Sequence, residues 1–344
     1  MPTIHAPEQW RAFYAAAAQF RDLAPWSWMY ESNIFGVQHP ETGEIGWCSI
    51  MGNAGEHFAL AIYRGAAGLN SYYNMVKTGD FESTNNPELF NAFFSQDCWM
   101  VSFEDATMVP PEQKAHLKSL GLSFRGAGQW IVVQALDLGL APWLADAQDV
   151  PYLTQCLQQA IDVTGRAKSN PGLSSDALRL VRTPTKQPGG LVWKDTFSGE
   201  PDSPEPTGPQ PVEPSKGFLD KTERLPEIRG AVALSSFFVP KAIQENKNKR
   251  PWHPMLLIGI EPKSGYILAQ ELAAYADVPA KLEKLLLSLF KAVGGKPRQI
   301  GVHHPPVARW LEKIGTAAGI EIVLLTGDEP FLTDVIDSFS DFLR

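Results

Sequence analysis

A proline-rich segment interrupts this chain and limits how it can fold. Between Glu200 and Ser215, prolines recur every two or three residues, mixed with acidic and small polar side chains. A segment of this composition cannot bury enough apolar surface to offset the entropy lost on ordering. We therefore predict an exposed, semi-rigid linker with a separate domain on each side. The length of 344 residues also suits two cores better than one.

The flanking sequence refines these boundaries. A Pro-Gly-Gly turn region separates the apolar run Leu178–Val181 from Leu191–Phe197, which predicts a β-hairpin before the linker. We predict four segments: an acidic N-terminal domain (1–165), a hairpin extension (166–199), the linker (200–225) and a C-terminal domain (226–344).

Charge is distributed unevenly between the two halves. Residues 1–165 hold 7 Lys and Arg against 17 Asp and Glu, which gives −10, and the remainder gives +2, for the total of −8. An acidic domain repels phosphate backbones. Nucleic acid is therefore an expected partner only for the C-terminal domain, and another protein is the other candidate partner.

The cysteines and the N-terminus bear on the compartment. Cys48, Cys98 and Cys156 are odd in number and far apart, which is typical of buried thiols in a reducing environment. The first ten residues lack the basic and apolar regions of a secretion signal. No stretch is apolar enough to span a membrane. We expect a cytoplasmic protein without a membrane partner.

The N-terminal domain has the pattern of an α+β fold. An amphipathic helix opens it, with Trp10, Phe13, Tyr14, Ala17 and Phe20 on one face. Five strands and two further helices are expected in this order: 34–38, 45–51, 57–63, 98–103, a helix at 111–120, 130–136, and a helix at 149–163.

The C-terminal domain has the pattern of an α/β fold in the order β-β-β-α-β-α-β-α. The expected strands are 231–239, 255–261, 266–272, 299–303 and 320–325. The first helix places Leu282, Leu285, Leu286, Leu289 and Phe290 at helical spacing and ends at Gly294-Gly295. The second helix carries Val307, Trp310, Leu311 and Ile314, and the last carries Val335, Ile336, Phe339 and Phe342.

This element order resembles the ribonuclease-H-like core of integrases and DDE-type transposases. The resemblance covers about a third of the chain and implies carboxylates that hold two metal ions. Here the first strand reads Ala231-Val-Ala-Leu-Ser-Ser-Phe-Phe, and the fourth ends in His303-His304-Pro305. Acidic residues do follow later in the chain (Asp328, Glu329, Asp334, Asp337). The metal-binding carboxylates that the family carries in the first and fourth strands are missing here. The resemblance therefore implies the fold without its usual active site.

The whole chain also resembles a family of uncharacterised bacterial two-domain proteins. The residues that carry this resemblance are Leu23-Ala-Pro-Trp-Ser-Trp-Met, Phe35-Gly-Val-Gln, Gly55-Glu-His-Phe-Ala-Leu-Ala-Ile-Tyr, Phe94-Ser-Gln-Asp-Cys and Ser102-Phe-Glu-Asp. The family implies no activity that could be transferred to this chain.

Four N-terminal residues are the candidates for catalysis. Glu56 and His57 could act as an acid/base pair or ligate a metal, although adjacent strand residues point to opposite faces. Glu104 and Asp105 lie at the end of a strand and could join Glu31 or Glu56 in an oxygen-rich cation site. A turn acid and a hydrogen-bonded histidine are the alternative for the first pair. Cys98 has an acidic neighbourhood, which favours a buried thiol over a nucleophile.

The candidate binding residues form three groups. His303 and His304 follow a strand at the sheet edge where α/β proteins bind ligands, with helix capping as the alternative. Trp26 and Trp28 could line a recognition cleft, with core packing as the alternative. A basic segment could contact phosphate and stack a base, with a solvated hairpin loop as the alternative. Its members are Lys241, Lys247, Lys249, Arg250 and Trp252, the last followed by His253.

The sequence contains no motif for dinucleotide, P-loop, zincin or hydrolase-elbow chemistry. We expect no cofactor and no bound metal, and a non-catalytic binding or adaptor protein is the leading hypothesis. Two alternatives stay open, namely nucleic-acid binding through the C-terminal domain and metal-dependent hydrolysis in the N-terminal domain.

Overall fold

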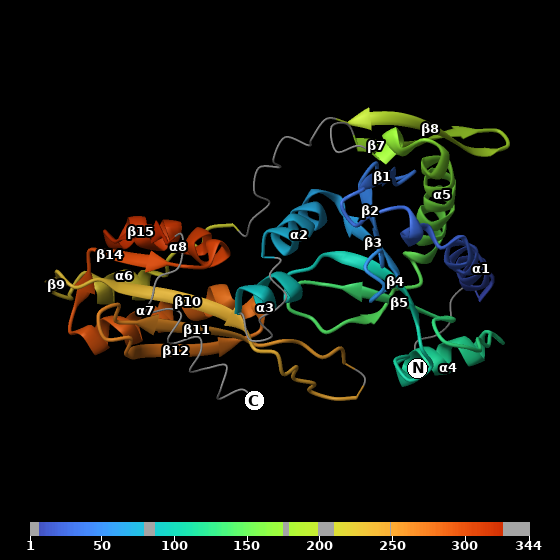
Figure 1. Cartoon of the computed structure of the whole chain (residues 1–344). Helices are drawn as coiled ribbons and strands as arrows, with labels where there is room; N and C mark the ends of the chain where they lie inside the picture. The colour runs from blue at the N-terminus through green and yellow to red at the C-terminus, as the bar shows by residue number, and fades with distance from the viewer. Residues whose placement is uncertain (1–6, 79–86, 175–178, 199–209, 248, 326–344) are drawn as a thin grey trace. The chain divides into compact units, whose positions relative to one another are not determined.

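The computed structural model of the chain describes residues 7–78, 87–174, 179–198, 210–247 and 249–325. It divides into two compact units. The first contains residues 1–74, 96–137 and 142–206, and the second contains 75–95, 138–141 and 207–344. Each unit mixes helices with a β-sheet, so the predicted mixed α/β character is confirmed (Figure 1).

The first unit is built on an eight-stranded sheet in the order β6-β5-β4-β3-β2-β1-β7-β8. All neighbours are antiparallel except β1 and β7, which are parallel. Its elements are α1 (Pro7–Leu23), η1 (Pro25–Ser27), β1 (Phe35–Gln38), β2 (Ile45–Met51), β3 (Ala59–Arg64), α2 (Gly65–Thr78), β4 (Cys98–Glu104), α4 (Pro111–Ser119), β5 (Trp130–Leu136), β6 (Trp143–Leu144), α5 (Val150–Ser169), η2 (Pro171–Ser174), β7 (Arg179–Gln187) and β8 (Gly190–Ser198).

Alternating residues of this sheet pack against helices on both faces. Ile50, Leu60 and Ile62 belong to a core with α1 and α5, whereas Ala61 and Tyr63 pack in a separate cluster with α2. This is the division expected when successive strand residues point to opposite faces. Figure 1 shows α1 and α5 on one side of the strands and α2 on the other.

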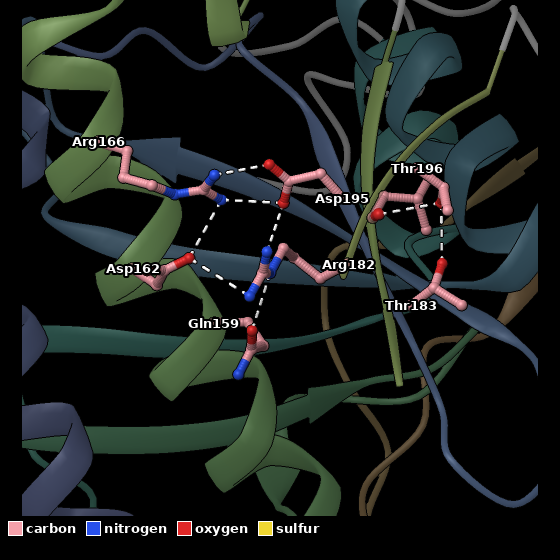
Figure 2. Close-up of polar contacts among 8 residues, drawn as sticks. Gln159, Asp162, Arg166, Arg182, Thr183, Asp195 and Thr196 are labelled. Atoms are coloured by element: carbon pink, nitrogen blue, oxygen red, sulfur yellow. Dashed lines mark hydrogen bonds and ion pairs between the residues drawn. The ribbon is translucent and has the colours of Figure 1, made fainter. Parts of the chain in front are cut away.

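The β7–β8 hairpin is part of this sheet. β7 pairs with β1, and a charge network joins the hairpin to α5 (Figure 2). Arg166 on α5 donates to Asp195 on β8 at 2.6 Å and lies 3.1 Å from Asp162. Arg182 on β7 donates to Asp195 and, at 2.9 Å, to Gln159. The segment predicted as an extension is therefore held by both backbone and side-chain bonds.

The second unit is built on a five-stranded sheet in the order β12-β11-β10-β14-β15. β10, β11 and β12 pair antiparallel, and β14 and β15 run parallel to β10. Its elements are α3 (Pro87–Phe94), α6 (Lys216–Thr222), β9 (Glu227–Ile228), β10 (Val232–Phe238), β11 (Met255–Ile260), β12 (Ile267–Ala273), η3 (Tyr275–Asp277), α7 (Val278–Val293), β13 (Lys296–Pro297), β14 (Gln299–Val302), α8 (Pro305–Ala318) and β15 (Glu321–Leu324). The last predicted helix lies outside the described residues.

Two cores lie against this sheet. Leu234 and Phe238 of β10 pack with α6, α7 and α8, and Phe237 packs with Ile258 and Ile260 in a second cluster. α7 ends at Gly294, which adopts a left-handed φ of 77° as the helix cap.

Two findings differ from the predicted boundaries. Residues 216–222 of the predicted linker form α6, where Ser215 caps the first turn and Phe218 is buried in the second core. Residues 75–95 and 138–141, predicted within the N-terminal domain, belong to the second unit. Residues 200–209 lie outside the described part, so the rest of the linker stays a prediction.

No helix in the described ranges is both long enough and apolar enough to cross a membrane.

Candidate functional site

The carboxyl ends of β10 and β14 form the candidate site. β14 pairs with Val232–Leu234 of β10, and His303 then donates its backbone N–H to the Leu234 carbonyl at 3.0 Å. β10 continues to Phe238, paired with β11 on its other side. The last part of β10 therefore continues past the point where its pairing with β14 ends. This is the edge at which α/β sheets commonly bind ligands.

Helix α3 covers this part of β10. The Asn91 amide nitrogen donates to the Ser236 carbonyl, and the Phe238 backbone N–H donates to the Asn91 amide oxygen, each at 3.0 Å. One amide side chain thus satisfies a donor and an acceptor that a neighbouring strand would otherwise pair. The site is occupied by the chain's own helix.

A hydrogen bond joins the strand ends at this site. The Ser236 hydroxyl and the His304 Nδ1 lie 2.9 Å apart. Burial, reinforced by neighbouring His303, lowers the pKa of His304 to about 4, so its imidazole is neutral at pH 7. Ser236 is only 2% exposed. A substrate cannot reach such a hydroxyl, so the pair is suited to packing and not to nucleophilic catalysis.

Aromatic rings extend from the site along the sheet. The Phe94 ring stacks on the imidazole of His253 with 3.8 Å between centroids, and it is T-shaped to the Phe238 ring with 5.9 Å between centroids. Tyr275 lies 6.0 Å from Phe238 and 5.2 Å from Trp310. His253 also approaches the Val239 carbonyl at 3.2 Å, and burial lowers its pKa.

The four candidate catalytic residues of the first unit do not converge. His57 Nδ1 lies 3.7 Å from Glu104 and His57 Nε2 lies 3.4 Å from the Met100 sulfur. Glu56 is exposed, and Asp105 accepts a hydrogen bond from the Gly128 backbone N–H at 2.8 Å. Only His57 and Glu104 are thus brought together, and Asp105 has a turn-stabilising contact.

Trp26 and Trp28 both pack against the core of the first unit. Trp26 contacts the rings of Phe58 and Phe103, with centroids 4.9 and 5.5 Å away. The Trp28 indole donates to the Thr164 carbonyl at 3.0 Å, and the Lys168 ammonium lies over its ring at 4.6 Å. These contacts support the packing interpretation of both residues, and the recognition cleft stays a prediction.

The basic segment lies in the loop between β10 and β11. Lys247 is exposed, and Lys249 pairs with Glu245 at 2.5 Å. Arg250 donates to the Ala141 carbonyl at 2.6 Å, and Trp252 is partly buried between two neighbouring segments. Two of the four predicted phosphate-binding cations, Lys249 and Arg250, therefore have contacts within the protein.

A partly buried arginine is a feature that sequence reasoning missed. Arg64, at the end of β3, donates to Asp97 and Asp137, and also to the Leu136 carbonyl at 2.7 Å. Its guanidinium lies 5.0 Å from the Trp99 ring. Burial raises the pKa of Asp97 in spite of Arg64, which acts in the opposite direction. No local spacing joins residues 64, 97 and 137, so only tertiary structure reveals this cluster.

The described ranges contain no group of three or more His, Cys, Asp or Glu residues that could hold a metal ion. The three cysteines are free and buried. Burial is the main cause that raises the pKa of Cys98, to about 12, so this thiol stays protonated at neutral pH.

The fold and the site together define a two-unit mixed α/β protein. Residues 10–181, half of the chain, match a family model described as a domain of unknown function (DUF7309), and the chain belongs to that family. Residues 219–340 match a second model, also described as a domain of unknown function (DUF6930). None of the curated proteins matches the chain.

Proposed function

We propose that this is a non-catalytic binding protein of the bacterial cytoplasm, with a ribonuclease-H-like second unit that lacks the metal-binding carboxylates. The strand order β12-β11-β10-β14-β15 supports this fold, because three antiparallel strands are followed by two that run parallel to the first. Three buried free thiols support a reducing compartment.

The hydrogen bond between Ser236 and His304 carries the proposal. In a ribonuclease-H-like enzyme, a carboxylate of the first strand and one at the end of the fourth would hold the metal ions. Here the corresponding strand ends present a buried hydroxyl and a neutral imidazole instead. Asn91 covers the adjacent backbone. Neither a hydroxyl nor an imidazole replaces the oxygen-rich, negatively charged ligand set that Mg²⁺ requires.

The test combines metal binding with a nuclease assay on the full chain. The melting temperature is followed at millimolar Mg²⁺, Mn²⁺, Zn²⁺ and Ca²⁺, and labelled single- and double-stranded DNA and RNA are incubated with Mg²⁺ or Mn²⁺. We expect a shift below about 1 °C and no cleavage above a buffer control. Metal-stimulated cleavage that Ser236→Ala or His304→Ala abolishes would refute the proposal, because a contaminating nuclease would be unaffected by either substitution.

The two alternatives have less support. A metal-dependent hydrolase in the first unit would need Glu56 and Asp105 near His57 and Glu104, and only the latter two approach each other. Nucleic-acid binding would use the cations of the β10–β11 loop, of which Lys249 already pairs with Glu245. Salt-dependent binding of an oligonucleotide that Lys247→Glu weakens would favour the second alternative.

A further inference from the structure

The loop between β10 and β11 forms a small, regular surface with a segment from elsewhere in the second unit. Trp252 exchanges both backbone hydrogen bonds with Ile243, at 2.8 and 2.9 Å. On its other side it is bridged to Leu140, flanked by bonds from Ala141 N–H to the Pro251 carbonyl and from His253 N–H to the Gly139 carbonyl. Trp252 is therefore the central member of three adjacent antiparallel segments.

These three side chains lie on one face. Residues directly opposite each other in antiparallel pairs share a face. Leu140 and Ile243 are 38% and 40% exposed, and Trp252 between them is partly exposed. We call Leu140, Trp252 and Ile243 the apolar stripe. Figure 1 shows the loop that follows β10 in gold.

The surroundings of the stripe are basic. The loop carries Lys241, Lys247, Lys249 and Arg250 against the single acid Glu245, a local charge of +3. Lys241 and Lys247 are exposed. Arg250 binds the Ala141 carbonyl at 2.6 Å and so helps to fix the segment that carries Leu140. The apolar stripe is thus held in place by its own hydrogen bonds and has a positive rim.

We propose that the apolar stripe docks a peptide segment of a partner protein that carries acidic residues beside aliphatic or aromatic anchors. The inference rests on the proposed binding function and names the kind of partner. The rim charge is complementary to acids, and three aligned apolar side chains match alternate side chains of an extended peptide. A nucleic acid fits less well, because aliphatic side chains flank Trp252 where further aromatic rings would be needed to stack successive bases.

The probe is a display library of random 12-residue peptides, selected on the full-length protein and counter-selected on Ile243→Asp. Ile243 is exposed, so we expect this variant to fold, and circular dichroism and the melting temperature check that it does. Enriched peptides should combine Asp or Glu with Leu, Ile or Phe. Their affinity should fall at least about tenfold with Ile243→Asp and about threefold with Lys247→Glu, the latter effect disappearing at high salt.

Leu272→Asp is the matched control, because Leu272 is 51% exposed on β12 of the same unit and lies outside the apolar stripe. We expect it to leave peptide affinity unchanged. Failure of the library to enrich peptides that distinguish wild type from Ile243→Asp overturns the inference. So does equal loss of affinity with Leu272→Asp.

A fluorescein-labelled oligo-dT of 20 nucleotides tests the competing ligand. Tight binding that both Trp252→Ala and Lys247→Glu abolish would overturn the peptide assignment in favour of nucleic acid. These results are independent of the metal and nuclease assays. Peptide selection can therefore fail while the protein remains non-catalytic, and metal-dependent cleavage would instead refute the proposed function itself.

Discussion

Phe94 stacks on His253 with ring planes 25° apart and centroids 3.8 Å apart. Phe94 lies within the part of the chain that matches the first family model, and His253 lies within the part that matches the second. The second unit is therefore completed by residues from outside its own family match. Asn91, on the same helix as Phe94, adds two hydrogen bonds to β10.

Removing either contact should destabilise the second unit. We expect Phe94→Ala to cost about 1–3 kcal/mol, because it removes ring contacts with His253 and Phe238. Asn91→Ala should cost about 1–3 kcal/mol, because it leaves a backbone donor and acceptor of β10 unpaired. Urea unfolding measures both. Phe93→Ala is the control: Phe93 is 46% exposed on the same helix, and a change within about 0.5 kcal/mol is expected. Equal effects of all three substitutions would contradict the assigned contacts.

Removing the hydroxyl group should affect stability differently at two buried tyrosines of the first unit. Tyr14 is 2% exposed, and within the described part of the chain its hydroxyl has no hydrogen-bond partner. Tyr152 donates to the Val37 carbonyl at 2.7 Å and accepts from the Gly46 N–H at 2.8 Å. Tyr14→Phe should be neutral or stabilising by up to about 1 kcal/mol, whereas Tyr152→Phe should cost about 1–2 kcal/mol.

Thermal unfolding of both variants beside wild type gives the comparison. A destabilised Tyr14→Phe would show that the hydroxyl does have a partner. Among the residues that the structure describes, His116 Nε2 is another buried atom without a hydrogen-bond partner. A water molecule shared by Tyr14 and His116 would explain that result.

The stability of the second unit should fall in mild acid. The folded-state pKa of His304 is about 4, below the ordinary value near 6.5. Between these values the unfolded chain binds a proton that the folded chain does not, so stability decreases as pH falls from about 6.5 towards 4. NMR titration of the His304 ring, with urea unfolding at several pH values, measures this. In His304→Asn, this decrease in unfolding free energy between about pH 6.5 and 4 should vanish. Titration of the His304 ring near pH 6.5 in the folded protein would disprove the lowered pKa.

The charge network of Figure 2 should also lose stability in acid, but at lower pH and through a carboxylate. Hydrogen bonds from Arg166, and then from Arg182, lower the pKa of Asp195. Its contribution is present above the ordinary value near 4 and is lost as pH falls through the lowered folded-state pKa. Asp195→Asn should cost about 0.5–1 kcal/mol at pH 7, since the network is partly exposed, and less in acid as the carboxylate becomes protonated.

Denaturant unfolding of Asp195→Asn at pH 7 and pH 3 provides the measurement, with Lys194→Gln as the exposed neighbour that should change little. A loss of stability that is the same at both pH values would show that the carboxylate charge is not responsible.

Elements with a strong local pattern could be predicted from the sequence. The residues expected on the inner face of one helix, Leu282, Leu285, Leu286, Leu289 and Phe290, are all buried in α7. A β-hairpin was expected around residues 178–197, and β7 and β8 pair there. These features depend on periodicity and turn residues, which a single sequence contains.

Other features depend on contacts between distant residues. Helix α3 was not expected, and its contact with β10 joins Asn91 to residues about 145 positions later. The parallel pairing of β1 with β7 likewise joins Gly36 to Val181. His303 and His304 were proposed as ligand-binding residues, but nothing near them in sequence indicated that Ser236 would be the partner of His304. No local periodicity encodes such pairings.

The assignment of alternating chain segments to the two units has a genetic consequence. The chain passes from one unit to the other five times, at residues 74/75, 95/96, 137/138, 141/142 and 206/207. A gene cut within the proline-rich segment would therefore separate residues 75–95 and 138–141 from the unit to which they belong. Fusion of the C-terminal half to another protein would transfer an incomplete second unit, so the two halves should be inherited as one reading frame and not exchanged as independent modules.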